Sequence, residues 1–216
     1  MKYYSVHFNR PDFLQIQKKY ITDGELIVLN NHANKTIETA CNNLNIKVIN
    51  LQHEMRISPS HSHGHALNYL KEIIDYDDDY CIMDHDFFPF KKISLDDHDF
   101  ISIKNYTSLN VLHMWPGLIV GKRGNSLKDI NFMPGVISGG DTGCDTSRII
   151  NNKKIKFLEW KRIGVEREKY AQLSPLITVA EDFGVHYLNG SNWMPCDEKV
   201  IQEKNKLLIS TLEALR

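Results

Sequence analysis

Apolar and polar positions along the first half of the chain follow the pattern of strands that alternate with helices. Short apolar runs fill 3–8, 25–29, 46–51 and 80–83, and runs of this length are typical of buried strands. Between them, residues 13–20, 35–44 and 64–75 place apolar side chains three or four positions apart, which predicts amphipathic helices. We expect Asn9 or Asp12 to cap the first helix. Short loops between such units predict parallel strands with right-handed crossovers.

The second half of the chain is less regular. Residues 100–103 and 118–121 read as strands, whereas 157–160, 176–179 and 185–188 are shorter and ambiguous runs. Residues 197–215 predict a helix with an apolar stripe, which we expect to pack on its own domain. The fold class that follows is α/β, with a mostly parallel, Rossmann-like central sheet flanked by helices.

Composition and charge narrow the class of protein. The 216 residues suffice for one domain with a real core, and the net charge of −1 gives no reason to expect nucleic-acid binding. No apolar run reaches the length of a membrane span, and the N-terminus lacks a signal-peptide core. Four widely spaced cysteines are typical of free thiols in a reducing compartment. We therefore expect a cytoplasmic protein. The chain stops at Arg216, directly after the last predicted helix. A place within a longer, multidomain protein therefore stays open.

The strongest candidate for chemistry is Asp84-His85-Asp86, at the end of the apolar run 80–83. Side chains two apart on a strand point the same way, so both carboxylates are expected to converge on one divalent cation. The carboxyl ends of strands are where open α/β sheets bind ligands. Hard oxygen ligands suit Mg²⁺ or Mn²⁺, which share their coordination shell with substrate phosphates. The motif predicts an enzyme that handles a nucleotide diphosphate through a metal.

Four sequence features together resemble the glycosyltransferases of the GT-A fold. They are the end of the first strand with its loop (6–13), the stretch 63–68 that opens the third helix, the acidic motif 84–89, and the pair of segments 139–143 and 186–191. Small viral and bacterial enzymes of this type, including those that glycosylate the capsids of large algal viruses, are most similar. A viral origin would place the protein in the host cytoplasm. The resemblance implies a single GT-A domain over 1–216, with a nucleotide-binding half (1–90) and an acceptor-side half (91–216).

This resemblance implies a ligand set for the metal and the donor. Asp86 would be the firmer ligand of Mn²⁺ or Mg²⁺, Asp84 would contact the ribose or reach the metal through water, and His186 would be a third ligand. The run 189–192 could supply backbone N–H groups to phosphate. The residues expected near the nucleotide are Asn9, Arg10, Asn30, Asn31, His63, Gly64, Asn68 and Asp84.

The expected reaction is transfer of a sugar, of the hexosyltransferase type, from a UDP-sugar or a GDP-sugar to a glycan or other hydroxyl acceptor, including a glycoprotein. Asp141, between glycines in Gly139-Gly140-Asp141-Thr142-Gly143, is the predicted general base, and Asp145 is a competitor for this role. Inverting and retaining outcomes both remain open. Trp115 and Trp193 are candidates to stack on a sugar ring, with ordinary core burial as the alternative.

Three other interpretations stay open. A sugar nucleotidyltransferase would need a glycine-rich basic loop after the first strand, and Asn9-Arg10-Pro11 is not one. A non-catalytic nucleotide-sugar-binding domain would bind the donor without turnover. A zinc site could use the histidines of the segment before the acidic strand, which are His53, His61, His63 and His65.

Overall fold

The first part of the chain forms strand–helix units, as its sequence predicts. A computed structural model describes residues 1–52, 58–181, 183–190 and 194–216. Its first half runs β1 (Lys2–His7), α1 (Pro11–Tyr20), β2 (Glu25–Asn31), α2 (Lys35–Asn43), β3 (Lys47–Leu51), α3 (Pro59–Ile73), β4 (Tyr80–Asp84) and β5 (Phe87–Pro89). Its second half comprises β6 (Phe100–Tyr106), β7 (Leu112–Gly121), a 3₁₀ turn η1 (Cys144–Thr146), α4 (Ser147–Ile150), β8 (Ile155–Leu158), β9 (Trp160–Gly164), a 3₁₀ turn η2 (Ala171–Leu173), β10 (Leu176–Ala180), β11 (Gly184–His186) and α5 (Glu198–Leu215).

The central sheet has seven strands in the order β3-β2-β1-β4-β7-β6-β8. Strand β1 pairs in parallel with both β2 and β4, and β2 pairs in parallel with β3. Strand β7 is antiparallel to its neighbours β4 and β6, whereas β8 is parallel to β6. The predicted α/β fold with a mostly parallel central sheet is confirmed. The carboxyl ends of β1, β2 and β4 therefore meet at one edge, where ligands of open α/β sheets bind.

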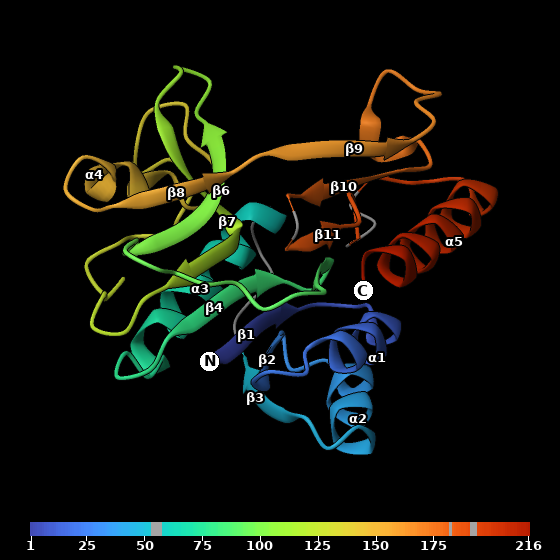
Figure 1. Cartoon of the computed structure of the whole chain (residues 1–216), viewed down its shortest axis with the longest axis horizontal. Coiled ribbons are helices and arrows are strands. Elements are labelled where there is room, and N and C mark those ends of the chain that lie inside the picture. The colour runs from blue at the N-terminus through green and yellow to red at the C-terminus, as the bar shows by residue number, and fades with distance from the viewer. Residues whose placement is uncertain (53–57, 182, 191–193) are drawn as a thin grey trace.

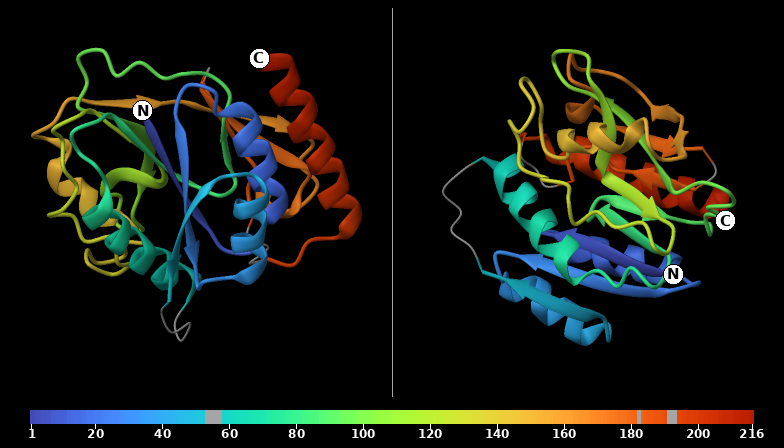
Figure 2. Two further views of the ribbon diagram at one scale, coloured as in Figure 1. Left: turned by 90° about the horizontal axis from the view of Figure 1, so that it is seen from below. Right: turned by 90° about the vertical axis from the view of Figure 1, so that its left-hand side faces the viewer.

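Helices cover both faces of this sheet. Neighbouring residues on a strand point to opposite faces, so each strand contributes to two separate core clusters. Tyr3 and Cys81 belong to the cluster that packs on α1 and α2, whereas Tyr4 and Ile82 belong to the cluster beneath α3. Figure 2 shows α3 across the strands from α1 and α2. Burial on both faces explains why these strands read as continuous apolar runs in the sequence.

A second, four-stranded sheet has the order β5-β11-β10-β9. It lies between the acidic end of β4 and helix α5, and Figure 1 shows β10 and β11 beside α5. Leu208 and Leu212 of α5 pack with Val179 of β10 and Val185 of β11 in a third core cluster. The apolar stripe of α5 thus packs on its own domain, as expected. The structure shows no helix, among the residues described, with the length and apolarity needed to cross a membrane.

Some predicted element bounds were wrong. Helix α3 begins at Pro59, five residues before the predicted start, because Ser58 caps it and proline suits the first helical position. Helix α1 begins at Pro11 with Arg10 at its N-cap and no side-chain capping bond, so neither Asn9 nor Asp12 caps it. The ambiguous run 157–160 is divided between β8 and β9.

Candidate active site

The two carboxylates of the acidic motif do not lie on one continuous strand. Strand β4 ends at Asp84, residues 85 and 86 form a turn, and β5 begins at Phe87. The expectation that strand alternation aligns Asp84 with Asp86 was therefore wrong. The turn sends the two side chains to different partners, one on α3 and one beside the small sheet.

Asp84 is turned toward α3, where it meets His63. The His63 Nε2 atom lies 2.8 Å from Asp84 Oδ1. Burial lowers the pKa of His63, but the neighbouring Asp84 carboxylate raises it, and the net shift is upward. Asp86 and Asp141 contribute to this rise. His63 therefore contacts one carboxylate, that of Asp84, and feels the negative charge of two more, those of Asp86 and Asp141.

Asp86 is 6% exposed and is held by the segment that follows β11. Its Oδ2 atom accepts a hydrogen bond of 2.9 Å from the Gly190 N–H group and lies 3.5 Å from His186 Nε2. Burial raises the pKa of Asp86, but the opposing effect of His186, His85 and the Gly190 N–H group is larger. The net pKa is therefore well below its usual range. The carboxylate is therefore ionised at neutral pH.

His186 reaches Asp86 because β11 pairs with β5. The antiparallel register places His186 opposite Phe87, the residue directly after Asp86. The ring of His186 packs against Trp115 and Trp160, with centroids 4.8 and 5.6 Å away. Two half-buried indoles thus form an apolar wall beside the histidine.

Gly190 is fixed to the acidic turn on two sides. Its N–H group binds Asp86, and its carbonyl accepts a 3.2 Å hydrogen bond from the Arg10 guanidinium. A Cβ atom at this position would collide with the Asp86 side chain. Arg10 also forms two hydrogen bonds with Asp12 and lies over the Phe13 ring, 3.7 Å from its centroid. Arg10 therefore holds the turn and the loop together.

The predicted nucleotide-binding residues lie in several settings. Asn30 is fully buried and binds Asn34 and Asn50, which ties β2 to β3 and to the start of α2. Asn68 binds the segment at Asn131 and Phe132. Asn9 is exposed in the turn between β1 and α1. Their roles toward a nucleotide stay predictions, as do those of Asn31, which binds Ser62 of α3, and of Gly64, which is buried in α3.

Asp141 is exposed, and its neighbour Thr142 fastens the loop to α3 through a 2.8 Å hydrogen bond to the Ser60 carbonyl. This bond brings Asp141 to the first turns of α3, in electrostatic reach of His63. Asp145 is 2% exposed and accepts hydrogen bonds from Asn131 N–H and Arg148. The structure thus gives Asp145 internal partners, whereas the role of Asp141 as base stays a prediction.

The histidines of the zinc interpretation separate along α3. His61 binds Ser58 at the helix start, His63 faces Asp84, and His65 is exposed. His53 lies outside the described residues, as do Trp193 and positions 191–192 of the predicted phosphate-binding run.

A divalent metal fits this site by the chemistry of its donors. Asp86 and His186 lie side by side, and carboxylate oxygen with neutral imidazole suits Mn²⁺. Asp84 is close but turned to His63. Within the described part of the chain, no three His, Cys, Asp or Glu side chains already converge as a metal cluster. Binding would therefore bring Asp84, water or phosphate oxygens to the Asp86–His186 pair.

Three buried polar residues near the site were not named as site residues from the sequence. Gln17 and His7 are fully buried, and Lys204 is 2% exposed. Gln17 and Lys204 interrupt the apolar faces of α1 and α5, and each binds main-chain carbonyls beside the acidic turn. For Gln17 and Lys204, a polar residue on an apolar helix face was the available signal, whereas His7 lies at the end of β1.

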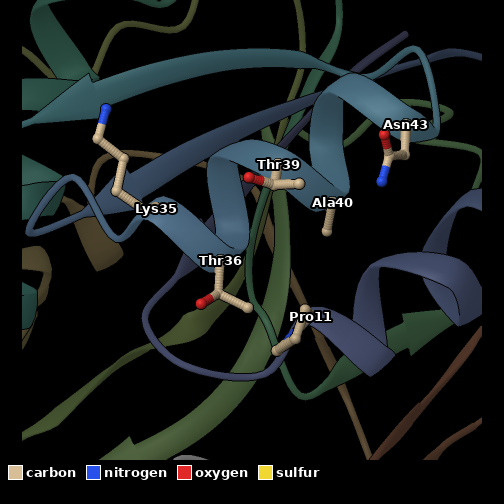
Figure 3. A pocket seen from close by; sticks show the side chains of 6 residues that line it. All are labelled: Pro11, Lys35, Thr36, Thr39, Ala40 and Asn43. Carbon is tan, nitrogen blue, oxygen red and sulfur yellow. The ribbon is translucent and has the colours of Figure 1, made fainter.

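A shallow hollow of about 430 Å³ lies elsewhere. Figure 3 shows its lining, with Pro11 at the start of α1 and the other side chains on α2. None of the predicted site residues lines it.

Comparisons with known proteins bear on the fold. No protein-family model matches the sequence, and no curated protein matches it. Among solved structures, the chain is similar to an active-site mutant of LgtC, with a TM-score of 0.50, 14% identity, and coverage of 74% of this chain and 73% of that one. It also matches the galactosyltransferase LgtC in complex with donor and acceptor sugar analogues, with a TM-score of 0.47, 13% identity and the same coverage of both chains. A third match is the mannosyltransferase PcManGT from Pyrobaculum calidifontis in complex with GDP-Man and Mn²⁺, with a TM-score of 0.46, 13% identity, and coverage of 72% of this chain and 53% of that chain. The likeness to the first of these structures shows the GT-A fold, and at 14% identity it shows the fold alone.

Proposed function

We propose that this protein is a metal-dependent glycosyltransferase that moves a sugar, of the hexose type, from a nucleotide-diphosphate sugar to a hydroxyl acceptor. One observation carries the proposal. At the carboxyl end of β4, the ionised Asp86 carboxylate lies 3.5 Å from His186 Nε2 in a buried turn, with Asp84 two residues away. An oxygen–nitrogen donor pair at this edge of a GT-A sheet suits a divalent cation that binds a diphosphate.

Charge supports a metal in this role. The negative charges of Asp84, Asp86 and Asp141 all act on His63, and a diphosphate would add negative charge to this region. Two basic side chains nearby are already engaged, since Arg10 binds Asp12 and Gly190, and Lys204 binds main-chain carbonyls. A bound Mn²⁺ or Mg²⁺ would neutralise the charge that develops on the nucleoside diphosphate as it leaves. Asp86 and His186 would hold it, and Asp84 would join them or bind the ribose.

The acceptor would approach from the side of the 139–143 loop. Asp141 is exposed there, and a carboxylate within reach of an acceptor hydroxyl can take its proton during attack. Trp115 and Trp160 would form the apolar wall against which a sugar ring lies. A UDP-sugar is the favoured donor and a GDP-sugar the next, because the sequence resemblance to GT-A glycosyltransferases implies this order.

A thermal-shift titration tests the proposal directly. UDP and GDP are added with and without Mn²⁺ to the wild type and to Asp86→Ala, because a ligand that binds only the folded state raises the melting temperature with its occupancy. We expect stabilisation that needs nucleotide and metal together and is lost in the variant. Stabilisation by neither nucleotide under any condition would contradict the proposal.

A turnover assay separates catalysis from binding alone. Release of sugar from UDP-sugars and GDP-sugars is followed with glycan acceptors and with water, at saturating Mn²⁺. Turnover that disappears in Asp86→Ala supports the transferase. Tight metal-dependent binding with no turnover on any donor would instead favour the non-catalytic domain. Formation of a sugar nucleotide from a sugar phosphate and a nucleoside triphosphate would favour the nucleotidyltransferase.

A further inference from the structure

Helix α1 places a buried amide against the main chain of the acidic turn. The Gln17 side chain is fully buried, although α1 is otherwise amphipathic with Phe13, Leu14 and Tyr20 on its buried face. Its Nε2 atom donates to the carbonyls of Asp84 at 3.2 Å, His85 at 3.3 Å and Phe87 at 2.9 Å. One side chain thus binds the backbone on both sides of Asp86.

The orientation of this amide is set by its partners. Three carbonyl oxygens converge on one atom of Gln17, and only the NH₂ group can donate to them. The Oε1 atom therefore faces His7 Nε2, 2.9 Å away, and accepts a hydrogen bond from its N–H group. This leaves His7 Nδ1 without hydrogen and, within the described structure, without a hydrogen-bond partner. Burial, with a smaller effect of His85, lowers the pKa of His7 to about 3, so its ring is neutral beside the acidic turn.

Removal of this donor would take a hydrogen-bond partner from buried carbonyls, and the cost of that loss favours a change in the turn. Asp86 lies in the middle of the turn, and its carboxylate must reach both Gly190 N–H and His186. A small rotation of the backbone at 85–86 would move this carboxylate away from its partners. The amide of Gln17 is thus placed to fix the orientation of Asp86, although its hydrogen bonds to the turn go to main-chain carbonyls and not to a carboxylate.

We propose that Gln17 is a positioning residue for the metal–diphosphate site, which it acts on through the three main-chain carbonyls of the 84–87 turn. This inference rests on the proposed function, because it assigns the turn to a divalent cation and a nucleoside diphosphate. Replacement of a residue that orients a metal ligand without touching the metal typically lowers metal affinity by roughly ten- to a hundredfold.

The test compares Gln17→Met with Gln15→Met. Both replace glutamine by methionine on α1, but Gln15 is exposed to solvent. A third variant, Ile37→Val in the buried face of α2, controls for a general loss of stability, because Ile37 is fully buried on the cluster that packs with α1 and α2. Calorimetry measures the Kd of UDP and of GDP in saturating Mn²⁺, and the Kd of Mn²⁺ alone, at a temperature where every variant is folded. A purely structural role would lower the melting temperature without changing these constants.

UDP or GDP, whichever binds the wild type in the presence of Mn²⁺, should bind Gln17→Met with a Kd raised tenfold or more. In Gln15→Met and Ile37→Val the Kd should stay within twofold of wild type. Gln17→Leu has a similar size and no donor, so it should show the same loss and serves if the methionine variant does not fold. Wild-type affinity in a folded Gln17 variant would overturn the positioning role alone. Failure of the wild type to bind either nucleotide with Mn²⁺ would overturn the proposed function and this inference with it.

Discussion

The two sheets contribute to the candidate site in different ways. Strand β4 lies in the centre of the large sheet, pairs in parallel with β1, and is buried along Tyr80–Met83. Strand β11 has three residues and pairs in antiparallel fashion with β5 and β10. The first delivers Asp84 at the end of a rigid element, and the second delivers His186 and the segment to Gly190. A buried parallel strand fixes one half of the site, whereas long-range pairing of a short strand creates the other.

Removal of the carboxylate that joins the two sheets should have the largest effect. We expect Asp86→Ala to lower kcat/KM for the donor by about a thousandfold, the upper range for loss of one electrostatic group in an active site. Asp84→Ala should lose less, because Asp84 is turned to His63 and not to His186. Steady-state kinetics with and without Mn²⁺ measure both. Equal losses would show that the large sheet carries as much of the site as the small one.

Gly190→Ala tests the half of the site that the small sheet contributes. A Cβ atom there would collide with the Asp86 side chain, so the Gly190 N–H bond to Asp86 cannot keep its geometry. We expect roughly a tenfold to hundredfold rise in the KM of the donor, in the range for loss of a group that orients a metal ligand. Gly124→Ala is the control, because its added Cβ would meet nothing within 4 Å and carries only the strain of a positive φ. A donor KM equal to wild type in Gly190→Ala would contradict the arrangement.

Lys204 of α5 binds the segment that joins β11 to Gly190. Its charge should make the stability of the protein sensitive to pH. Its Nζ atom donates to the carbonyls of Gln172 and Leu188, and burial lowers the pKa of Lys204 to about 8, against a smaller opposing effect of Cys196 and Asp86. The unfolded amine keeps its ordinary pKa of 10.5. Below pH 8 both states are protonated, and the folded state bears the full cost of the buried charge, roughly 3 kcal/mol.

This cost should disappear as the pH rises from 8 to 10.5, because the folded protein then releases the proton before the unfolded chain does. The stability of the wild type relative to Lys204→Met should therefore increase over that interval. Urea unfolding at pH 7, 8, 9 and 10 measures the difference. A difference that stays constant over this range would show that Lys204 titrates normally.

The smallest effect is expected in the large sheet. Ser5 lies on β1, fully buried, and its hydroxyl has no hydrogen-bond partner among the described residues. Ser5→Ala removes an unsatisfied polar atom, so we expect a gain of about 1 kcal/mol in the free energy of unfolding. Nucleotide binding should stay unchanged. Destabilisation by the alanine would indicate that the hydroxyl is hydrogen-bonded in solution.

Much of the fold and part of the site could be predicted from local pattern. Buried parallel strands require apolar runs, and helices that cover them require an apolar face, so β1, β2, β4 and α2 are visible in the sequence. Asp84 and Asp86 stand out because carboxylates end an apolar strand. The ambiguity of 157–160 has a physical cause, since the run is shared by two strands in different sheets.

By itself, the sequence determined the fold class, the place of the acidic motif at a strand end, and the candidate residues Asp86, His186 and Asp141. Only the tertiary structure decided which of these side chains meet. The turn at 85–86 parts Asp84 from Asp86, the β5–β11 register brings His186 beside Asp86, and Gln17 binds the turn from 67 to 70 positions away in the chain. Local propensity depends on near neighbours, whereas these contacts depend on strand register and helix packing between distant segments, which no short pattern encodes.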